Sequence, residues 1–421
     1  MSDTIFALSS GAPPAAVALV RISGPKADAA LAALAGRLPE PRIATLARLR
    51  DGDEVLDNAL VVRFPGPASA TGEDVAELHL HGGRAVVASV LAALVRIEGL
   101  RPAQPGEFTR RAFDNGRIDL AEAEGLADLL EAETESQRRQ AMALVGGVLG
   151  RQVAAWQEEL LALAASVEAV LDFSDEDDVA PLPADFAPRL ARLRDSMTSW
   201  LARPPAERLK EGIRVVIAGP VNAGKSSLLN ALIGRDAAIV TPVPGTTRDL
   251  IEASVAFGGV PFLLVDTAGL RESPDEVEAI GIARARASTG AADLILWLGP
   301  PGDAPAGAIR VHSKADLGGA VQPTDLSVSA TIGTGVEQLI SLLVRRAATL
   351  LPAEGEVSLN ARHREALREA VVSLAGFESV ADLLIVAELL RRARSSLGSI
   401  TGKAGVEDML DALFGRFCIG K

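Results

Sequence analysis

Short apolar runs separated by glycine- and proline-containing turns dominate the first part of the chain. These runs predict four β-strands, at Thr4–Leu8, Ala16–Ile22, Ala59–Phe64 and Val75–Leu80. Between them, Lys26–Leu38 and Arg84–Ile97 repeat apolar residues with helical spacing. The pattern therefore predicts an α+β domain over residues 1–118.

From Asp119 to about Lys210 the pattern changes to long helices rich in Ala, Leu, Glu and Arg. The pair Gly146-Gly147 predicts a break in the first helix. The acidic run Asp172–Asp178 ends the next helix and is either a metal site or, as charge runs usually are, a solvated loop. Helical pattern returns from Ser358 to the C-terminus, in segments 362–369, 382–397 and 406–417.

Residues 212–350 alternate apolar strands with helices, a pattern typical of a parallel α/β domain. Helix-rich sequence flanks this block on both sides, so we expect the α/β domain to be inserted into one helical domain. The predicted order is an α+β domain (1–118), a first helical part (119–210), the α/β domain (211–352) and a second helical part (353–421).

Composition narrows the class of protein. The 421 residues are 48% hydrophobic but contain no apolar run of about twenty residues, so no membrane span is predicted. A single cysteine, Cys418, excludes an internal disulfide and favours a cytoplasmic location. A net charge of −13 argues against a general nucleic-acid coat, although local basic patches remain compatible with it. With no Tyr and 3% aromatic residues, base stacking is not expected to dominate RNA contacts.

A phosphate-binding loop follows the apolar run Ile213–Ala218. The sequence Gly219-x-x-x-x-Gly224-Lys225-Ser226 leads into Leu228-Leu229, so the order is strand, glycine loop and helix. In such loops the backbone N–H groups surround phosphate oxygens at a helix N-terminus. Lys225 is expected to reach the β- and γ-phosphates, and the Ser226 hydroxyl to ligate Mg²⁺. The predicted nucleotide contacts of this loop are Asn222, Ala223, Gly224, Lys225, Ser226 and Ser227.

Further motifs occur downstream in the order that a GTPase requires. An apolar strand, Pro261–Val265, leads into Asp266-Thr267-Ala268-Gly269, which suits an Asp that holds Mg²⁺ through water and a Gly N–H at the γ-phosphate. Between these two motifs, Thr246-Thr247 offers a second hydroxyl ligand for Mg²⁺. Past the strand Ile309–His312, the carboxylate of Asp316 in Ser313-Lys314-Ala315-Asp316 can accept two hydrogen bonds from guanine, and Ser329-Ala330 offers a backbone N–H for its O6. Together these motifs predict a Ras-like P-loop GTPase domain.

Two positions differ from Ras-like switches. Leu270 follows the Asp266–Gly269 motif and cannot orient the attacking water as a Gln does. Glu278 is our candidate for orienting the water. The spacing is equally compatible with Glu278 being an ordinary exposed acid. Asn222 lies inside the phosphate loop, where its side-chain oxygen either helps to bind a monovalent cation that neutralises developing charge or only stabilises the loop.

Several further blocks carry a family resemblance over essentially the whole chain. They are Val20–Gly24, Phe64–Pro67, Thr71–Asp74, His81–Gly83, Pro105–Phe113, Asp119–Glu124 and the C-terminal Phe417–Lys421. With the GTPase motifs, they resemble the MnmE (TrmE) family of tRNA-modification GTPases. The motifs Gly245–Asp249 and Asp266–Arg271 also occur in related GTPases, whereas the N-terminal blocks and the Cys-Ile-Gly-Lys terminus are more specific.

The resemblance implies a homodimer built through a folate-binding N-terminal domain, with the G domain inserted in a helical domain. Such proteins act with the flavoprotein MnmG to place a carboxymethylaminomethyl or aminomethyl group on C5 of the wobble uridine of certain tRNAs. It further implies a 5-formyl- or methylene-tetrahydrofolate donor and potassium-dependent GTP hydrolysis. The implied residues are Asn222, Thr241, Val243 and Thr246 for K⁺; Ser226 and Thr247 for Mg²⁺; Glu278 for water; and Arg21, Glu77, Arg117 and Lys421 for folate.

Other interpretations of these residues stay open at the level of sequence. Arg21 and Glu77 could form an ordinary ion pair across strands, and His79 with His81 could suggest a metal but lack an evident third ligand. Cys418 is a nucleophile towards uridine C6, a redox partner or a buried small residue. Basic candidates for tRNA contact are Arg110, Arg111 and Arg117, and a second group at Arg391, Arg392 and Arg394 that a solvated helix face explains equally well. The alternative function is a regulatory RNA- or ribosome-assembly GTPase without modification chemistry.

Three departures from the family pattern are evident. Ser313 stands where an Asn is usual in the guanine motif, and Arg117 stands where the family commonly has Lys. The third departure is the short segment Gly299–Ala308. Because a parallel crossover usually needs a dozen or more residues, this segment predicts a G domain that has lost most of one peripheral helix.

Overall fold

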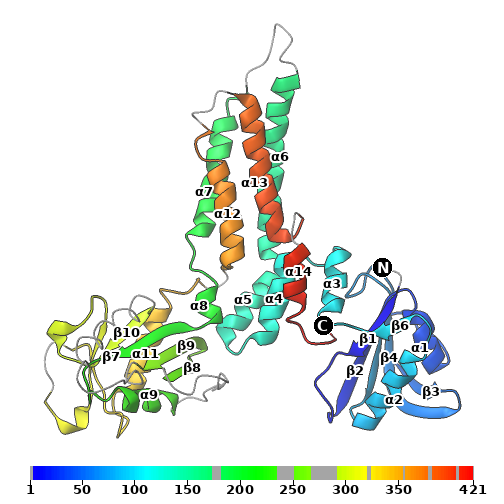
Figure 1. Ribbon diagram of the computed structural model, residues 1–421, viewed down its shortest axis with the longest axis horizontal. Helices are drawn as coiled ribbons and strands as arrows, with labels where there is room; N and C mark the ends of the chain where they lie inside the picture. The colour runs from blue at the N-terminus through cyan, green and yellow to red at the C-terminus, as the bar shows by residue number, and fades with distance from the viewer. Residues whose placement is uncertain are drawn as a thin grey trace. The chain divides into compact units, whose positions relative to one another are not determined.

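A computed structural model describes the chain over residues 3–172, 182–234, 251–266, 292–319, 324–353, 356–377, 382–403 and 407–420 (Figure 1). The chain divides into two compact units, and each is described by itself. The first comprises Met1–Ala127 with Gly398–Lys421, and the second comprises Asp128–Leu397. The N-terminal α+β region and the C-terminal end of the chain thus belong to the same unit.

The first unit is built on a six-stranded sheet with the order β3-β4-β5-β2-β1-β6. All neighbouring strands are antiparallel except β1 and β6, which are parallel. The strands are β1 (Thr4–Leu8), β2 (Val17–Ser23), β3 (Thr45–Asp51), β4 (Glu54–Phe64), β5 (Val75–His81) and β6 (Leu100–Pro102). The four predicted strands are confirmed, and β3 and β6 are added by the structure.

Two helices, α1 (Ala27–Ala35) and α2 (Arg84–Val95), supply the apolar residues that cover one face of this sheet. Alternate residues of the strands enter this core, including Val20 and Leu78, which are fully buried. The intervening residues, Arg21 and Glu77 among them, therefore point to the opposite face. Near β1 that face is covered by Phe108 of α3 (Glu107–Asp114), which packs with Ile5.

The C-terminal segment packs within the same unit. Apolar residues of α14 (Glu407–Phe414) and Phe417 form a cluster with Leu120 and Ala123 of α4 (Leu120–Glu131). Beyond α14, Ile419 forms an isolated antiparallel bridge with Pro105. Gly420 follows with φ 98°, and a Cβ there would lie 2.2 Å from the carbonyl oxygen of Leu8, so only glycine fits. The C-terminal residues are thus held against the N-terminal sheet.

Helices of the second unit form a bundle (Figure 1). They are α6 (Val148–Asp172), α7 (Phe186–Leu201), α12 (Ala361–Ser373) and α13 (Leu383–Thr401), and the shorter α5 (Glu135–Val145) and α8 (Glu207–Lys210) lie outside the bundle. The predicted break at Gly146-Gly147 is confirmed between α5 and α6. In the bundle Trp156 meets Trp200 edge to face at 5.6 Å, and Arg364 of α12 donates to the carbonyl oxygen of Leu201. Helices that precede and follow the α/β block therefore pack on one another.

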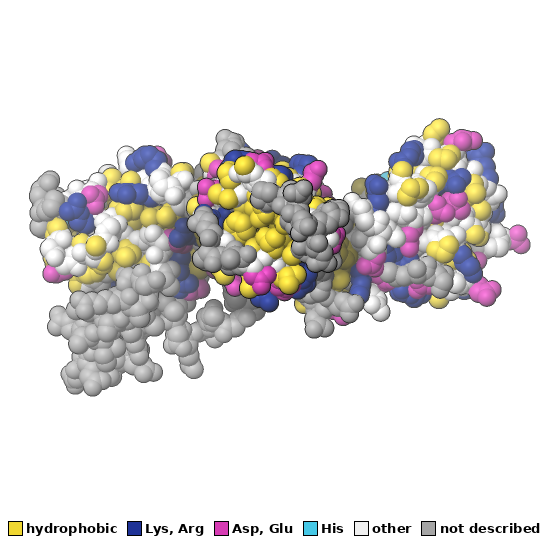
Figure 2. Space-filling model, turned by 90° about the horizontal axis from the view of Figure 1, so that it is seen from above, with side chains coloured by type: hydrophobic (Ala, Val, Ile, Leu, Met, Phe, Trp, Pro, Cys, Tyr) yellow, Lys and Arg dark blue, Asp and Glu magenta, His cyan; other side chains and the backbone are white. Residues whose placement is uncertain are grey.

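Exposed apolar side chains occur where α12 ends and α13 begins. Val372, Leu384 and Ile385 are each at least half exposed. Figure 2 looks onto this end of the bundle and shows hydrophobic side chains gathered there.

The α/β block contains a second six-stranded sheet with the order β12-β11-β10-β7-β9-β8, in which only β8 and β9 pair antiparallel. Its elements are β7 (Ile213–Ala218), α9 (Lys225–Ile233), β8 (Ile251–Phe257), β9 (Val260–Asp266), β10 (Leu294–Trp297), β11 (Ile309–His312), β12 (Leu326–Ser327) and α11 (Val336–Ala347). The predicted fold class, an α+β domain with a helical domain and a mostly parallel G domain, is confirmed.

The connection between the parallel strands β10 and β11 carries only a short 3₁₀ turn, Pro301–Asp303. The crossover helix predicted to be missing is therefore absent from this described segment. The two strands still pair at Leu296–Ile309. The central strands that carry the phosphate loop are consequently kept in place.

Candidate functional site

The phosphate loop of the second unit runs from the end of β7 to the start of α9. Gly219 (φ 151°), Asn222 (φ 60°) and Gly224 (φ 92°) all have positive φ. A Cβ on Gly219 would lie 3.2 Å from backbone and side-chain carbons of Leu298, so the loop passes close to the end of β10. Asn is one of the few non-glycine residues that tolerate the left-handed region. The motif therefore builds a tight turn at the N-terminus of α9, where unpaired N–H groups favour an anion.

Two side chains of α9 point back toward this loop. The buried Lys225 donates from Nζ to the carbonyl oxygens of Gly219 and Pro220, both at 2.9 Å. Ser226 Oγ donates to Asp266 Oδ2 at 2.6 Å, and Asp266 is completely buried at the end of β9. A hydroxyl and a carboxylate are thus brought together beside the phosphate loop. Hard oxygen donors of this kind suit Mg²⁺, which is usually held by few protein ligands together with phosphates and water.

The guanine motif is tied to the phosphate loop by two side chains. Ser313 Oγ donates to the carbonyl oxygen of Ala223 at 2.6 Å, and Lys314 Nζ donates to that of Asn222 at 2.7 Å. Although Ser313 replaces the usual Asn, it still reaches the loop. Two hydrogen bonds therefore connect the guanine motif to the phosphate loop.

The carboxylate of Asp316 is held by a hydrogen bond from Ser329. The buried Ser329 donates from Oγ to Asp316 Oδ1 at 2.5 Å, which fixes one carboxylate oxygen. A cavity of about 70 Å³ lies here, lined by Gly224, Ser227, Leu228, Ser313, Lys314, Asp316, Val328, Ala330 and Thr331. The structure thus gathers predicted base and phosphate contacts from distant parts of the sequence around one cavity.

Other predicted site residues lie outside the described part of the chain. They are Thr241, Val243, Thr246, Thr247, Thr267, Ala268, Gly269, Glu278 and Lys421. Their proposed roles in binding K⁺, Mg²⁺, nucleotide, water and folate stay predictions.

In the first unit, Arg21 and Glu77 are directly opposite each other on β2 and β5. Arg21 donates from Nε and Nη2 to Glu77 Oε1 at 3.0 and 2.9 Å, and its guanidinium lies 5.9 Å from the Phe108 ring. The cross-strand ion pair is therefore formed, while a folate role remains a prediction. Arg117 is exposed and lies beside Gly72.

The histidines near this pair have carboxylate neighbours. His79 Nε2 lies 3.7 Å from Glu77 Oε2, and His81 Nδ1 lies 2.7 Å from Asp57 Oδ1. Within the described ranges, no group of three or more His, Cys, Asp or Glu residues is arranged to hold a metal ion. Among the described residues, none therefore acts as a third ligand for a metal at His79 and His81.

Cys418 is exposed, which overturns the interpretation of this residue as a buried small side chain. Its neighbour Ile419 bridges to Pro105, so the thiol belongs to the same unit as Arg21 and Glu77. The nucleophilic and redox roles both remain predictions.

Arg111, which the sequence suggested as a tRNA contact, lies in the interior of the first unit. Arg111 is completely buried and donates to the side chains of Asp3, Glu73 and Glu107. The expectation that Arg111 contacts tRNA is therefore wrong. Burial alone would raise the pKa of Glu107, but hydrogen bonds from Arg101 and the Gln104 N–H lower it below its usual value.

Three of the other basic candidates for RNA contact, Arg110, Arg391 and Arg392, form ion pairs with acids. Arg110 donates to Asp411, while Arg391 and Arg392 both donate to Glu388. Hydrogen bonds from those two arginines lower the pKa of Glu388 to about 2. Arg110 is thus matched by one acid, whereas Arg391 and Arg392 share the single carboxylate of Glu388.

Comparison with known proteins identifies the family. The profile of the MnmE helical domain matches residues 120–418, and that of the GTP-binding protein TrmE N-terminus matches residues 4–117. A tRNA modification GTPase MnmE from Rhizorhabdus wittichii is 61% identical over 100% of this chain and 97% of its own length. The one from Erythrobacter litoralis is 56% identical over 100% of both chains. The chain belongs to the MnmE family of tRNA-modification GTPases.

Membership of the MnmE family means that the chain is a GTPase that binds guanine nucleotide and acts in tRNA modification. Among solved structures, the G domain of the T. maritima FeoB iron transporter is 25% identical, with a TM-score of 0.25, over 32% of this chain and 98% of its own. In the described part of the chain, no helix is long and apolar enough to cross a membrane.

Proposed function

We propose that this GTPase, together with an MnmG-type flavoprotein, adds a carboxymethylaminomethyl or aminomethyl group to C5 of the wobble uridine of certain tRNAs. In this proposal a 5-formyl- or methylene-tetrahydrofolate supplies the one-carbon unit and GTP hydrolysis depends on K⁺. The observation that carries it is the combination in one chain of a guanine-nucleotide site with a separate charged pair, Arg21–Glu77, in a TrmE-type N-terminal unit.

The nucleotide part of the proposal is supported by the two hydrogen bonds that connect the guanine motif to the phosphate loop. Lys225 binds the β- and γ-phosphates, and Asp316 accepts hydrogen bonds from the guanine edge. Ser226 with Thr247 holds Mg²⁺, assisted by Asp266, and the ion supplies charge neutralisation at the phosphates. The 2.6 Å contact between Ser226 and Asp266 supports this because both oxygens are already adjacent.

The potassium part of the proposal centres on Asn222, with Thr241, Val243 and Thr246 as further ligands. A K⁺ ion there would neutralise charge that develops between the β- and γ-phosphates. Asn222 lies within the phosphate loop at φ 60°. Its main-chain carbonyl oxygen accepts a hydrogen bond from Lys314 Nζ. Glu278 orients the attacking water in this proposal.

The folate half rests on the N-terminal unit. The Glu77 carboxylate can accept paired hydrogen bonds from the N–H groups of a pterin, while Arg21, Arg117 and Lys421 suit the glutamate tail. Arg21 and Glu77 are each about one-fifth exposed, with side-chain values of 21% and 16%, so both are accessible to a ligand. In this proposal the chain works in the cytoplasm as a homodimer and Cys418 takes part in the chemistry at uridine.

Steady-state GTP hydrolysis in KCl and in NaCl at equal ionic strength tests the GTPase mechanism. We expect strong stimulation by KCl in the wild type and its loss in Asn222→Ala. Because Ala is strained at positive φ, Asn222→Gly is the matched control that keeps the backbone conformation but also lacks the side-chain oxygen. Stimulation retained in Asn222→Gly would exclude Asn222 as a K⁺ ligand. Equal rates of the wild type in both salts would favour a regulatory RNA- or ribosome-assembly switch.

A further inference from the structure

Arg117 differs from the two other arginines near α3 in the state of its guanidinium. Arg110 pairs with Asp411, and Arg111 pairs with three carboxylates in the interior. Arg117 is exposed, and within the described ranges its guanidinium forms no hydrogen bond or ion pair. The charge of Arg117 is therefore available for an anion.

The aliphatic part of the Arg117 side chain packs on the backbone of Gly72. A Cβ placed on Gly72 would lie 3.2 Å from Cγ of Arg117 and 3.5 Å from its Cδ, and only 2.8 Å from Cβ of Asn115. Gly72 also has φ 81°, a left-handed conformation that residues with a side chain rarely adopt. A side chain at position 72 would therefore displace Asn115 and crowd the stem of Arg117.

A chain of hydrogen bonds fixes Gly72 relative to Arg21. Ser23 follows Arg21 by two positions on β2, so both side chains belong to the same face of the sheet. The hydroxyl groups of Ser23 and Thr71 share a hydrogen bond of 2.7 Å, and Asn115 Nδ2 donates to the carbonyl oxygen of Thr71 at 2.8 Å. The backbone that supports the free guanidinium is thus anchored to the strand that carries Arg21.

We propose that Gly72 is a positioning residue, which together with Asn115 directs Arg117 to the glutamate tail of the folate. This inference rests on the proposed folate function and adds how Arg117 is oriented. Arg21 already donates from Nε and Nη2 to Glu77, whereas the guanidinium of Arg117 is free to meet a carboxylate of the ligand. A side chain that is held in place loses less conformational freedom on binding, so its contact with the tail is stronger.

Calorimetry of the full chain with two ligands tests this role. One ligand is 5-formyl-tetrahydrofolate, and the other is 5-formyl-tetrahydropterin, which lacks the benzoylglutamate tail. In Gly72→Ala we expect the folate to bind at least about tenfold more weakly, the effect of losing one charge-assisted hydrogen bond. The pterin should bind as it does to the wild type. Damage to the fold of the unit would instead weaken both ligands alike.

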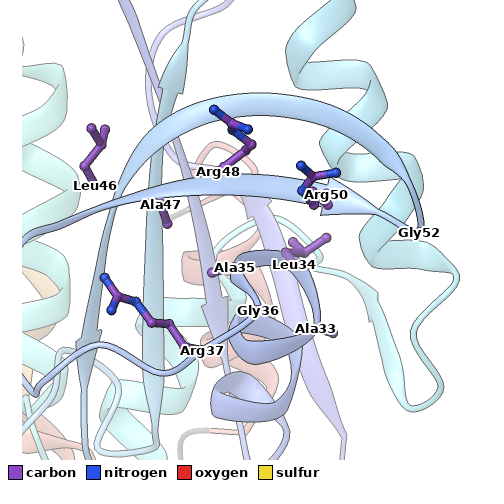
Figure 3. A pocket seen from close by; sticks show the side chains of 10 residues that line it. All are labelled: Ala33, Leu34, Ala35, Gly36, Arg37, Leu46, Ala47, Arg48, Arg50 and Gly52. Carbon is purple, nitrogen blue, oxygen red and sulfur yellow. The ribbon is translucent and has the colours of Figure 1, made fainter.

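Arg117→Gln completes a double-mutant cycle. Because Gly72 acts through Arg117, adding Gly72→Ala to Arg117→Gln should weaken folate binding no further. Gly36→Ala is the matched control, since Gly36 has φ 76° and no described atom lies within 4 Å of a Cβ there. Gly36 ends α1 beside a cavity of about 510 Å³ (Figure 3), and α1 covers the face of the sheet opposite to the Arg21 side chain. The control should therefore bind folate like the wild type.

Asn115→Ala tests the same arrangement without backbone strain, because it keeps Gly72 and removes only the hydrogen bond to Thr71. We expect a loss of about fivefold for the folate and none for the pterin. Unchanged folate affinity in both Gly72→Ala and Asn115→Ala, or an equal loss of both ligands, would overturn the inference and leave the folate function standing. A full further effect of Gly72→Ala in the Arg117→Gln background would do the same. No binding of 5-formyl-tetrahydrofolate by the wild type would overturn the folate function and this inference with it.

Discussion

The Oγ atom of Ser226 donates a 2.6 Å hydrogen bond to Oδ2 of Asp266. This contact joins the first turn of α9 to the end of β9, across forty positions of sequence. Because β7 and β9 are parallel neighbours, their carboxyl ends lie at the same edge of the sheet. A hydroxyl and a buried carboxylate therefore meet beside the phosphate loop, where a divalent cation would be useful.

Replacing either member of this pair should weaken the use of Mg²⁺. We expect Ser226→Ala and Asp266→Asn to raise the Mg²⁺ concentration for half-maximal GTP hydrolysis by about 10–100-fold, the usual effect of losing a group that supports a metal. A Mg²⁺ titration of hydrolysis measures this shift. Ser199→Ala, on the exposed face of α7, is the control and should behave like the wild type. An unshifted titration curve in both site variants would remove the pair from the metal site.

The serine at position 313 should limit nucleotide affinity. Its single hydroxyl hydrogen is used on the carbonyl oxygen of Ala223, whereas an Asn amide has two N–H donors and could also serve the base. We expect Ser313→Ala to weaken GDP binding by about fivefold, since one hydrogen bond contributes about 1 kcal/mol. Ser313→Asn should tighten binding. Titration with a fluorescent GDP analogue measures both, and weaker binding by Ser313→Asn would contradict the argument.

Removal of the Glu77 charge should abolish most folate binding. Glu77→Gln keeps the shape of the side chain but loses a charged acceptor, and charged hydrogen bonds contribute about 1.5–3 kcal/mol. We therefore expect 5-formyl-tetrahydrofolate to bind the full chain at least about tenfold more weakly in calorimetry. Glu54→Gln, at an exposed position on β4, is the matched control. Unaltered affinity in Glu77→Gln would mean that its pair with Arg21 serves only the fold.

Arg111 should be essential for stability of the first unit. Arg111→Met leaves the carboxylates of Asp3, Glu73 and Glu107 without their buried partner, a change that typically costs about 3–5 kcal/mol. The exposed neighbour Arg110→Met should cost no more than about 1 kcal/mol.

Hydrogen exchange of the β2 and β5 amides measures this loss in the first unit. All three tryptophans, Trp156, Trp200 and Trp297, lie in the second unit, so their fluorescence reports independently that this unit is unchanged. Equal protection in the Arg111 and Arg110 variants would contradict the assignment of Arg111 as a buried hub.

The same network predicts a loss of stability in acid. Burial opposes ionisation of Asp3 and Glu107, yet hydrogen bonds from Arg101 and Arg111 hold the pKa values of both carboxyls below their usual 3.8 and 4.5. A lowered folded-state pKa contributes stability above the unfolded value that is lost as pH falls through the folded value. We expect exchange protection of the first unit to decline below about pH 4.5. Glu107→Gln should flatten this decline, and an unchanged pH profile would count against the network.

Local pattern was sufficient for much of the fold. Apolar runs predicted β1, β2, β4 and β5, and two adjacent glycines marked the boundary between α5 and α6. The short segment after β10 also correctly indicated a missing crossover helix. Strand β3 was missed because charged residues interrupt its apolar pattern at Arg48, Arg50 and Asp51. Only its pairing with β4 makes it a strand.

The sequence by itself determined the nucleotide chemistry, because phosphate and guanine recognition demand particular residue types at short, ordered spacings. Only the tertiary structure decided which basic residues face solvent. Arg110 and Arg111 are chemically identical neighbours, but consecutive residues of a helix point about 100° apart. One side chain therefore reaches an acid at the surface while the other enters the interior. The contact between Ser313 and Ala223 likewise joins residues that chain order keeps apart.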